Sequence, residues 1–287
     1  MTLRQITAAG ALVLAAGPAL AAGHAQPAVT GYALANDGST LLVMADIAMP
    51  AEVMALDLAM ALDAIAYRPV TGELLGYTNG AVYGIDPMSG DMTDLGARVM
   101  EDAMVAGGAM VGFDFNNAID AVRVVSSAGD NLVYFPEGFG DNDARAGSLR
   151  RFTDLAYAEG DTNAGAMPMI FANAYTNAIA GMTASGTLQY ALDAGTDALV
   201  TLANNDGTLT TVAPVTLDGL TLDLSGLGGF DIVSPEEGTD MAYAILQAEG
   251  SDSAGLYMID LATGAATLQA DLGLGGITGF AVSISGM

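Results

Sequence analysis

Carboxylates set at fixed points among apolar runs are the side chains of this sequence best suited to chemistry. Asp114 lies in the stretch GFDFNN, and Asp231 holds the same place in GGFDI. Two buried carboxylates with raised pKa values could serve as the acid and base of a glycoside hydrolase. In repeated frameworks, however, buried polar groups usually satisfy hydrogen bonds of neighbouring elements. We therefore predict structural roles for Asp114 and Asp231, and for Arg123 and Asn131 in the same region.

Two later loops carry oxygen-rich side chains of the kind that bind calcium. Asp141 and Asp143 lie in DNDARAG, and Asp161 and Asn163 lie in EGDTNAG. Neither loop follows the twelve-residue helix–loop–helix pattern, because neither has a glutamate at its final ligand position. Solvated turns rich in Asp, Asn and Gly are the alternative interpretation. Calcium is the one cofactor that the sequence suggests, with these four residues as candidate ligands.

Side chains that are missing from the sequence exclude several mechanisms. The chain has no cysteine, and all seven of its basic residues are arginines. It therefore lacks a thiol nucleophile, a thiolate metal site, a Schiff-base lysine and a P-loop lysine. The only histidine, His24, lies close to the N-terminus, where chain ends commonly fray. A Ser-His-Asp triad and a histidine-ligated zinc are thus disfavoured, and carboxylate chemistry remains.

The charge of the chain is strongly negative. Its 33 acidic residues face 7 basic ones, which gives a formal net charge of −26. Such a charge repels phosphate backbones and anionic lipid surfaces, so we expect neither nucleic-acid nor membrane partners. Repulsion within the folded chain falls when salt screens it, which is typical of halotolerant proteins. We expect a monomer whose partner is a small molecule, a glycan or a protein.

The first residues have the pattern of a secretory signal peptide. One positive charge at Arg4 precedes an apolar run, and small residues surround Ala21. A membrane anchor is the alternative, but Gly17 and Pro18 interrupt the run, which is shorter than the ~20 residues needed to span a bilayer. We predict a signal peptide over residues 1–21, a flexible segment over 22–29 and a single domain over 30–287. The mature protein would be exported, to the periplasm or beyond the cell.

Internal repeats predict the fold. Residues 64–96 and 228–273 each contain four short strand-like runs separated by turn residues, as expected for a four-stranded antiparallel meander. Two further units begin at VGFDFNN and MIFANAYTN, and the first of them is expected to end near SLRRFTDLAY. The N-terminal runs TGYALAND and TLLVMADIAM lack a first strand, and ITGFAVSIS at the C-terminus can supply it. This pattern predicts an all-β, five-bladed propeller of four-stranded blades, closed by the C-terminal strand.

A long β-sandwich or a jelly roll is the alternative fold, since it also has many short strands. It does not explain five units that open on similar runs, nor a terminal half-unit that complements the other end. Residues 141–168 form the widest gap in the strand pattern. We predict that this segment is a non-β excursion on the surface.

Several stretches resemble a known bacterial family. GFDFNNAIDAVRVVSSAGDNLVYFPEG, AYAEGDTNAGAMP, NAYTNAIAG and GLYMIDLATGAATLQADLG occur in the order typical of the family catalogued as domain of unknown function 4394. The resemblance runs from about residue 31 to the C-terminus, and it implies an exported protein with propeller-like repeats but no activity. Ala121 and Val133 stand where the family tends to have arginine, whereas Arg123 and Asn131 are kept. The loss of two cations disfavours anion binding by this unit.

Two hypotheses for function follow. The first is an exported propeller without catalytic activity that binds a ligand or partner, or serves as a surface or matrix component. The second is a carboxylate-dependent hydrolase, assisted by calcium, that acts at the mouth of the central channel. Three or more converging carboxylates at one channel mouth would favour the enzyme, and an apolar mouth would favour the binding or structural protein. We favour the first hypothesis.

Overall fold

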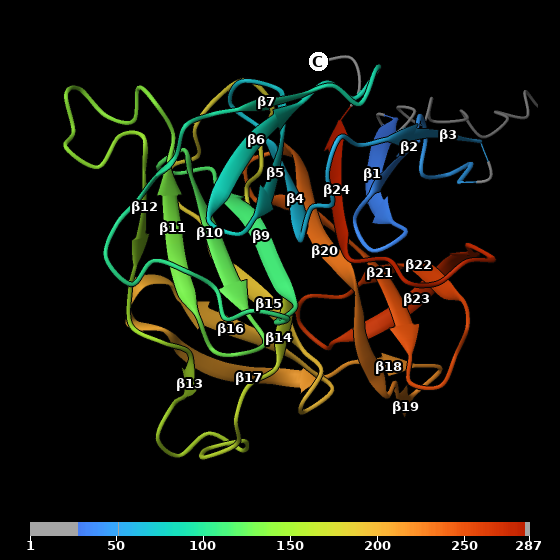
Figure 1. Ribbon diagram of the computed structural model, residues 1–287. Coiled ribbons are helices and arrows are strands. Elements are labelled where there is room, and N and C mark those ends of the chain that lie inside the picture. The colour runs from blue at the N-terminus through green and yellow to red at the C-terminus, as the bar shows by residue number, and fades with distance from the viewer. Residues whose placement is uncertain (1–27, 51, 285–287) are drawn as a thin grey trace, which may run out of the picture.

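The protein forms five small β-sheets arranged in a ring, as the predicted propeller requires (Figure 1). A computed structural model describes residues 28–50 and 52–284. The predicted signal peptide therefore lies outside the described residues. Within them, the one helix is the short 3-10 helix η1 (Asn204–Asp206). No helix of the described chain is long and apolar enough to cross a membrane.

Each sheet is one blade, and its strands run in order from the axis outward. Blade 1 contains β24 (Gly279–Ile284), β1 (Val29–Ala35), β2 (Thr40–Met44) and β3 (Val53–Asp57). Blade 2 contains β4 (Ala64–Arg68), β5 (Glu73–Thr78), β6 (Ala81–Ile85) and β7 (Met92–Asp94). Blade 3 contains β9 (Val111–Asn116), β10 (Ala121–Ser126), β11 (Asn131–Phe135), β12 (Ser148–Arg151) and β8 (Arg98–Val99).

Blades 4 and 5 complete the ring. Blade 4 contains β14 (Ile170–Tyr175), β15 (Gln189–Asp193), β16 (Ala198–Ala203), β17 (Thr208–Pro214) and β13 (Ala156–Tyr157). Blade 5 contains β20 (Leu224–Glu236), β21 (Thr239–Ala248), β22 (Ala254–Ile259), β23 (Ala265–Asp271), β18 (Thr216–Leu217) and β19 (Leu220–Thr221). The innermost strands β24, β4, β9, β14 and β20 contact one another around the axis.

The two ends of the chain meet in blade 1. Strand β24 pairs antiparallel with β1, from Val29 opposite Ile284 to Leu34 opposite Gly279. The two strands lie side by side at the ends of the colour scale in Figure 1. The C-terminal strand is thus the inner strand of the N-terminal blade, and the predicted closure is confirmed.

The outer edges of three blades differ from the four-stranded prediction. The short strands β8, β13 and β18 each lie in the connection that leads into a blade. They pair in parallel with the fourth strand of that blade, which is β12, β17 and β23 respectively. Strand β12 lies at SLRR, where the unit that begins at VGFDFNN was predicted to end. Strand β13 also lies within residues 141–168, so that segment is not the purely non-β excursion that was predicted. A covered edge presents fewer unpaired backbone groups to other chains, which explains why a connecting segment lies along it.

Apolar packing between blades forms most of the core. The strands are buried on both faces because each blade lies between two others; β11, for example, is buried along its whole length. Separate apolar clusters join blades 1 and 2, 2 and 3, 4 and 5, and 5 and 1. The cluster between blades 3 and 4 is smaller and is accompanied by buried polar side chains. Buried polar groups must be hydrogen-bonded, so the packing of blade 3 against blade 4 depends on specific hydrogen bonds as well as on apolar contacts.

Glycines let the inner strands approach closely at the axis. A Cβ atom on Gly229 would lie 2.4 Å from the backbone nitrogen of Phe280, and one on Gly112 would lie 2.7 Å from Oδ1 of Asn173. The space left between the inner strands is about 10 Å³. That volume is roughly enough for one water molecule. The axis is therefore filled, and no ligand site runs through it.

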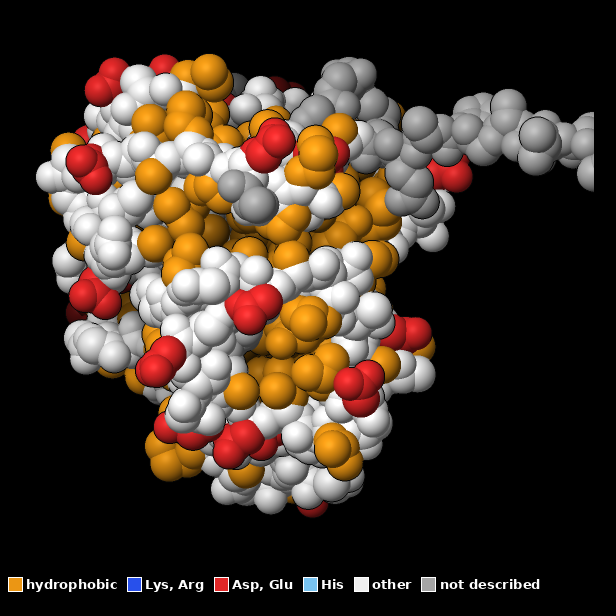
Figure 2. All heavy atoms as spheres, turned by 90° about the vertical axis from the view of Figure 1, so that its right-hand side faces the viewer, with side chains coloured by type: hydrophobic (Ala, Val, Ile, Leu, Met, Phe, Trp, Pro, Cys, Tyr) orange, Lys and Arg blue, Asp and Glu red, His pale blue; other side chains and the backbone are white. Residues whose placement is uncertain are grey.

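The side of the ring formed by blades 1 and 5 carries apolar hollows. A cavity of about 200 Å³ lies there, lined by Ala33, Leu42, Met44, Pro50, Val53, Ile245, Leu272, Leu274 and Ile277. Figure 2 shows hydrophobic side chains gathered in hollows on this side, with carboxylates between and around them. Val53 is 41% exposed at its edge.

Candidate functional site

A cavity lies at the end of the ring where the inner strands begin. Its volume is about 420 Å³. All five blades or their connections line it, through Asp37, Leu62, Asp63, Asn79, Gly226, Leu227, Phe171, Thr278 and residues 105–111. Concave sites that gather several elements at one end of a rigid scaffold are where small molecules usually bind. We call it the mouth cavity.

The mouth cavity has an apolar floor. Leu62, Val111 and Phe171 line it and are almost fully buried, with 2%, 4% and 3% of their surfaces exposed. Leu227 is half-buried beside them. These side chains come from blades 2 to 5 or from the residues just before them. An apolar floor contributes binding energy by releasing water from the surface that a ligand covers.

Polar side chains form the rim of the mouth cavity. Asp37, Asp63 and Asn79 are exposed and line it. Asp37 has φ of 54° in the turn between β1 and β2, and the next residue, Gly38, accepts a 3.0 Å hydrogen bond from the backbone N–H of Leu62. The backbone N–H of Asn79 donates to Oδ2 of Asp63 at 3.3 Å. One backbone hydrogen bond and one accepted by the Asp63 carboxylate thus hold two hairpin turns at the same edge of the cavity.

Asn79 and Gly80 show how sequence places part of this rim. They connect β5 to β6 with Thr78 opposite Ala81, and both have positive φ, 48° and 79°. A two-residue hairpin loop of this kind requires positive φ at both positions, which Asn-Gly tolerates best. The sequence therefore fixes where Asn79 stands at the cavity.

One buried hydroxyl at the mouth cavity has no partner. Oγ1 of Thr278 is buried and makes no hydrogen bond to any described residue. The backbone N–H of Thr278 donates to the carbonyl oxygen of Leu34 at 3.0 Å, so the residue is fixed in place just before β24. An unpaired buried polar atom is costly, so this hydroxyl lowers the stability of the fold at the edge of the cavity.

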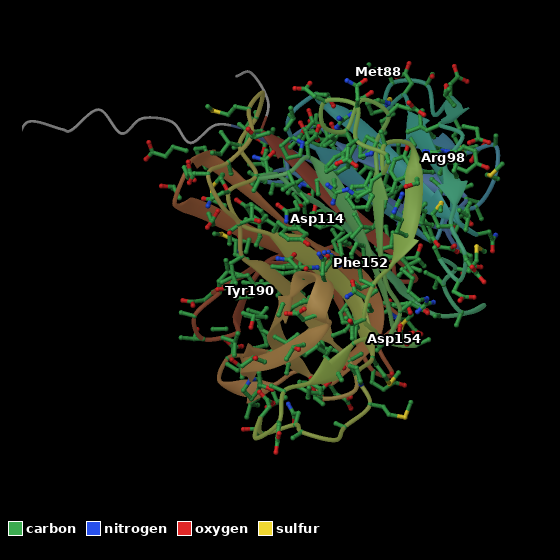
Figure 3. The ribbon with its side chains drawn as sticks, turned by 90° about the vertical axis from the view of Figure 1, so that its left-hand side faces the viewer. Met88, Arg98, Asp114, Phe152, Asp154 and Tyr190 are labelled. Carbon is green, nitrogen blue, oxygen red and sulfur yellow. The ribbon has the colours of Figure 1, made fainter. Side chains whose placement is uncertain are left out.

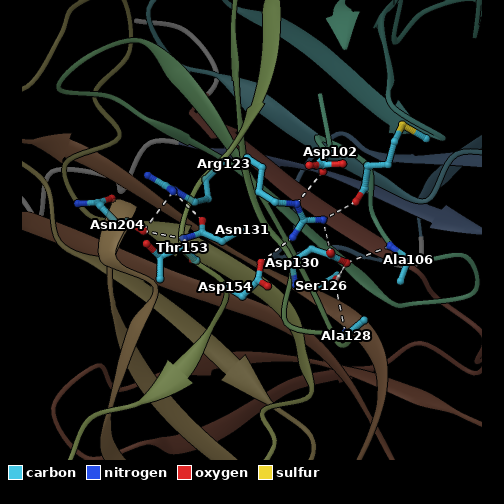
Figure 4. A network of polar contacts seen from close by, with 12 residues as sticks. Asp102, Ala106, Arg123, Ser126, Ala128, Asp130, Asn131, Thr153, Asp154 and Asn204 are labelled. Carbon is cyan, nitrogen blue, oxygen red and sulfur yellow. Dashed lines mark hydrogen bonds and ion pairs between the residues drawn. The ribbon is translucent and has the colours of Figure 1, made fainter. Parts of the chain in front are cut away.

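An ion pair anchors the wall of the mouth cavity, which residues 105–110 form (Figure 4). Arg151 donates to the carbonyl oxygens of Asp102 and Met104 at 2.6 and 2.7 Å, and to Oδ1 of Asp130 at 2.6 Å. Oδ2 of Asp130 accepts the backbone N–H of Ala106 at 3.0 Å. The carboxylate and the guanidinium therefore hold the segment that leads into the wall from both sides.

The pKa of Asp130 reflects this role. Burial raises the pKa of Asp130. Hydrogen bonds from Ser126, Ala106 and Arg151, together with the charge of Arg151, lower it by more, so the pKa lies below its ordinary value. Asp130 is therefore ionised at neutral pH. Its stabilising contacts are present above the pKa of an unfolded aspartate and are lost as the pH falls through the lower native value.

Asp114 and Asp231 lie inside the ring, on the inner strands β9 and β20. Figure 3 shows Asp114 in the interior, far from Met88 and Arg98 at the periphery. Oδ2 of Asp114 accepts the backbone N–H of Tyr175 at 2.7 Å, and Oδ2 of Asp231 accepts that of Val282 at 2.7 Å. Each donor belongs to the inner strand of the next blade. The inner edge of a blade has no neighbouring strand, so these carboxylates satisfy N–H groups that would otherwise be unpaired.

Burial raises the pKa of both carboxyls. It raises the pKa of Asp231 to about 7, and burial together with the charge of Asp231 raises that of Asp114 well above its ordinary value. Raised carboxyl pKa values are also what acid catalysis requires. Asp114 and Asp231 are however almost fully buried, and neither lines the mouth cavity.

We expect Asp231→Asn to change how stability depends on pH. Native Asp231 keeps a proton that the unfolded chain releases near pH 4, so its contribution to stability is greatest in acid and is lost as the pH rises through about 7. The variant cannot ionise. Its melting temperature relative to the wild type should rise by about 5 °C between pH 5 and pH 8. Thermal unfolding at both pH values is the measurement, with exposed Asp91→Asn as the control; a constant difference for Asp231→Asn would contradict the expectation.

Arg123 and Asn131 lie between blades 3 and 4 (Figure 4). Arg123 is 4% exposed, and it donates to Oη of Tyr175, Oδ1 of Asn131 and Oδ1 of Asn205 at 3.1, 2.6 and 3.0 Å. Nδ2 of Asn131 donates to the carbonyl oxygen of Asn204 at 2.9 Å. The two side chains thus link β10 and β11 of one blade to the turn after β16 in the next.

The candidate calcium ligands lie in two loops, where other groups engage three of them. Asp143 forms an ion pair with Arg145 at 2.7 Å. Asp161 accepts hydrogen bonds from the backbone N–H groups of Asn163 and Thr211, each at 2.8 Å. Among the described residues, no three acidic, histidine or cysteine side chains are grouped as metal ligands. Calcium binding by Asp141, Asp143, Asp161 and Asn163 stays a prediction.

Salt and calcium should have separable effects on stability. Repulsion between exposed carboxylates falls as the Debye length shortens from ~30 Å at 0.01 M salt to ~3 Å at 1 M, so the melting temperature should rise along a sodium chloride series. Calcium that binds an oxygen cage only in the native state should add a further rise over magnesium at equal ionic strength. A flat sodium chloride series would contradict the screening argument. Identical calcium and magnesium curves would show that the loops are solvated turns.

Sequence reasoning missed the residues of the mouth cavity. Asp37, Asp63 and Asn79 stand in separate turns of blades 1 and 2, and none lies in a recognisable motif. The available signal was their position in the blades. Asp37 and Asn79 each occupy the turn between the second and third strands of a blade, and Asp63 directly precedes an inner strand. Once the ring was predicted, such positions could have been compared between blades.

Two solved structures that match the chain are distant from it in sequence. A protein of unknown function from Bacteroides caccae is 10% identical, with a TM-score of 0.41, over 91% of this chain and 100% of its own. A structural genomics protein of unknown function from Bacteroides thetaiotaomicron is 12% identical, with a TM-score of 0.49, over 88% of this chain and 56% of its own. No curated protein matches the chain. The family model described as "Domain of unknown function (DUF4394)" matches residues 42–281, and the chain therefore belongs to that family.

Proposed function

We propose that the protein is an exported binding protein without catalytic activity, which holds a small molecule in the mouth cavity. The cavity itself is the observation that carries this proposal. It has a volume of about 420 Å³, an apolar floor and a polar rim, as small-molecule sites commonly have. Its wall is tied to blade 3 by Arg151 and Asp130, so much of the site is formed before a ligand arrives. Preorganisation of this kind favours binding.

The proposed destination rests on the sequence. The first 21 residues have the pattern of a secretory signal peptide, and the large excess of acidic residues suits an environment of high ionic strength. The periplasm and the extracellular space both fit. A surface or matrix role would be compatible with ligand binding at the mouth cavity.

Catalysis by a carboxylate pair is the alternative. Asp37 and Asp63 are the two carboxylates among the residues that line the mouth cavity, one fewer than the three that would favour a hydrolase. Under the proposed function, chromogenic glycosides and esters are not hydrolysed above the buffer rate. Turnover by the wild type that disappears in Asp37→Asn and Asp63→Asn would establish the hydrolase instead.

A pair of tryptophan variants tests binding at the mouth cavity. Ala109 lines the cavity, whereas Ala164 is exposed in a distant loop and does not line it. Compounds from a library of small fragments should raise the melting temperature of the wild type and of Ala164→Trp. Ala109→Trp fills part of the cavity and should lose the effect; a ligand at 100 times its Kd adds about 2.7 kcal/mol to stability. Hits that bind Ala109→Trp equally well, or a library without hits, would overturn the proposal.

A further inference from the structure

We propose that the ligand of the mouth cavity is a small amphiphilic amine, a molecule with an apolar body and a protonated amino group. This inference rests on the proposed function and names the ligand class of the same site. Three features of the cavity carry it: the charge of the rim, the chemistry of the floor and the exposed side-chain amide of Asn79.

The rim of the mouth cavity favours a cation. Asp37 and Asp63 line it, and its lining contains no arginine, lysine or histidine. Within the described chain, neither carboxylate forms an ion pair with an arginine. A ligand cation therefore meets two carboxylates without competing with a protein cation. The net charge of −26 also attracts cations towards the molecule and repels anions.

The floor of the mouth cavity favours an apolar body. Leu62, Val111, Phe171 and Leu227 present hydrocarbon surface there. A sugar or a linear polyamine would place hydroxyl or amino groups against these side chains, where they would lose hydrogen bonds to water. A hydrocarbon or aromatic group instead removes apolar surface from water on both sides. The face of Phe171 could also attract an ammonium group.

Asn79 offers one polar contact at the rim. Its exposed side-chain amide can accept a hydrogen bond from an N–H or O–H group of a ligand, or donate one. Together with Asp37 and Asp63, Asn79 supplies a small number of placed polar groups. A site that presents both apolar and polar surface is what an amphiphilic ligand of limited size requires.

Three probes of similar size separate the effect of charge from that of shape. They are 2-phenylethylamine, which is protonated at neutral pH, 2-phenylethanol, which is neutral, and 3-phenylpropionate, which is an anion. We expect the amine to bind about five- to tenfold more tightly than the alcohol, because an exposed carboxylate contributes modestly to each ion pair. The anion should bind more weakly than both. Titration calorimetry at low ionic strength is the measurement, and added sodium chloride should weaken the amine alone.

Two asparagine variants with the same change of net charge distinguish a local contact from the general field. Asp63→Asn removes a rim carboxylate, whereas Asp91→Asn removes an exposed carboxylate that does not line the cavity. Asp63→Asn should lower the affinity for the amine about two- to threefold, because Asp37 remains, and should leave the affinity for the alcohol unchanged. Asp91→Asn should leave both affinities unchanged. An equal loss in the two variants would mean that only the overall charge attracts the amine, and would overturn the inference.

The remaining outcomes separate this inference from the proposed function. If the amine and the alcohol bind equally, and Ala109→Trp abolishes both, the cavity binds ligands but its ligand is not defined by an amino group. If none of the three probes binds, the ligand class is wrong, and the fragment comparison between Ala109→Trp and Ala164→Trp decides whether the mouth cavity binds at all. Tighter binding of 3-phenylpropionate would also overturn the inference.

Discussion

A chain truncated after Gly275 should not fold into a soluble monomer. The truncation removes β24, which forms the inner strand of blade 1 and pairs with β1 along six residue pairs. Blade 1 would then expose the unpaired inner edge of β1, and apolar side chains such as Phe280 and Val282 would be missing from the cluster between blades 5 and 1. An open hydrophobic strand edge promotes aggregation. Size-exclusion chromatography and thermal unfolding should show aggregates and no cooperative transition.

The control for this truncation is a chain that ends at Ile284. It retains β24 in full and should elute and melt like the complete protein. Addition of a synthetic peptide covering residues 276–287 to the truncated chain should restore part of the folded monomer. A cooperative transition in the Gly275 truncation, at the temperature of the complete protein, would show that β24 does not close the ring.

Replacement of Arg123 by alanine should lower the stability of the protein strongly. In Arg123→Ala, the acceptors of Asn131, Tyr175 and Asn205 lose a buried charged donor at the interface between blades 3 and 4. Loss of one partner in a buried charged network typically costs about 3–5 kcal/mol. Because the apolar cluster at this interface is the smaller one, little else compensates. We expect a fall in the melting temperature of roughly 10 °C.

Arg145→Ala is the matched control for Arg123→Ala. Arg145 belongs to the same blade and pairs with Asp143, but its side chain is 45% exposed. Exposed ion pairs contribute about 0–1 kcal/mol, so this variant should melt close to the wild type. Arg123→Lys keeps the charge but not the planar fork, and we expect an intermediate loss. Equal melting of Arg123→Ala and Arg145→Ala would show that the buried network contributes nothing to stability.

The blades could be predicted because their strands repeat. GFDF and GGFDI mark the inner strands of blades 3 and 5, and turn residues separate the strands that follow. The closure followed from a unit without a first strand at one end and a spare strand at the other. These signals are local, or are repeated often enough to be compared, so they survive in one sequence without its structure.

The outermost strands could not be predicted. Strands β8, β13 and β18 are each two residues long, which is too short for any alternation of polar and apolar residues to appear. Their pairing depends on where the connecting chain lies after the blades have packed. Strand β12, by contrast, lies at SLRR, where the unit that begins at VGFDFNN was predicted to end.

The residues of the mouth cavity could not be predicted for a different reason. Leu62, Phe171 and Leu227 are more than 50 residues apart in the chain, and only the ring brings them to one floor. Asp114 was easier to interpret, because a polar residue repeated on buried strands indicates a shared hydrogen bond. A binding surface assembled from single residues of different blades has no such repetition.

The pairing of β24 with β1 also sets the order of events during synthesis. Val29 is among the first described residues to leave the ribosome, and its partner Ile284 is among the last. Blade 1 therefore stays incomplete until nearly the whole chain has been made, while blades 2 to 5 can assemble from contiguous segments. Closing so long a loop is slow compared with forming a local hairpin. The ring therefore remains open until the residues of β24 have been made, although four of its five blades can already be complete.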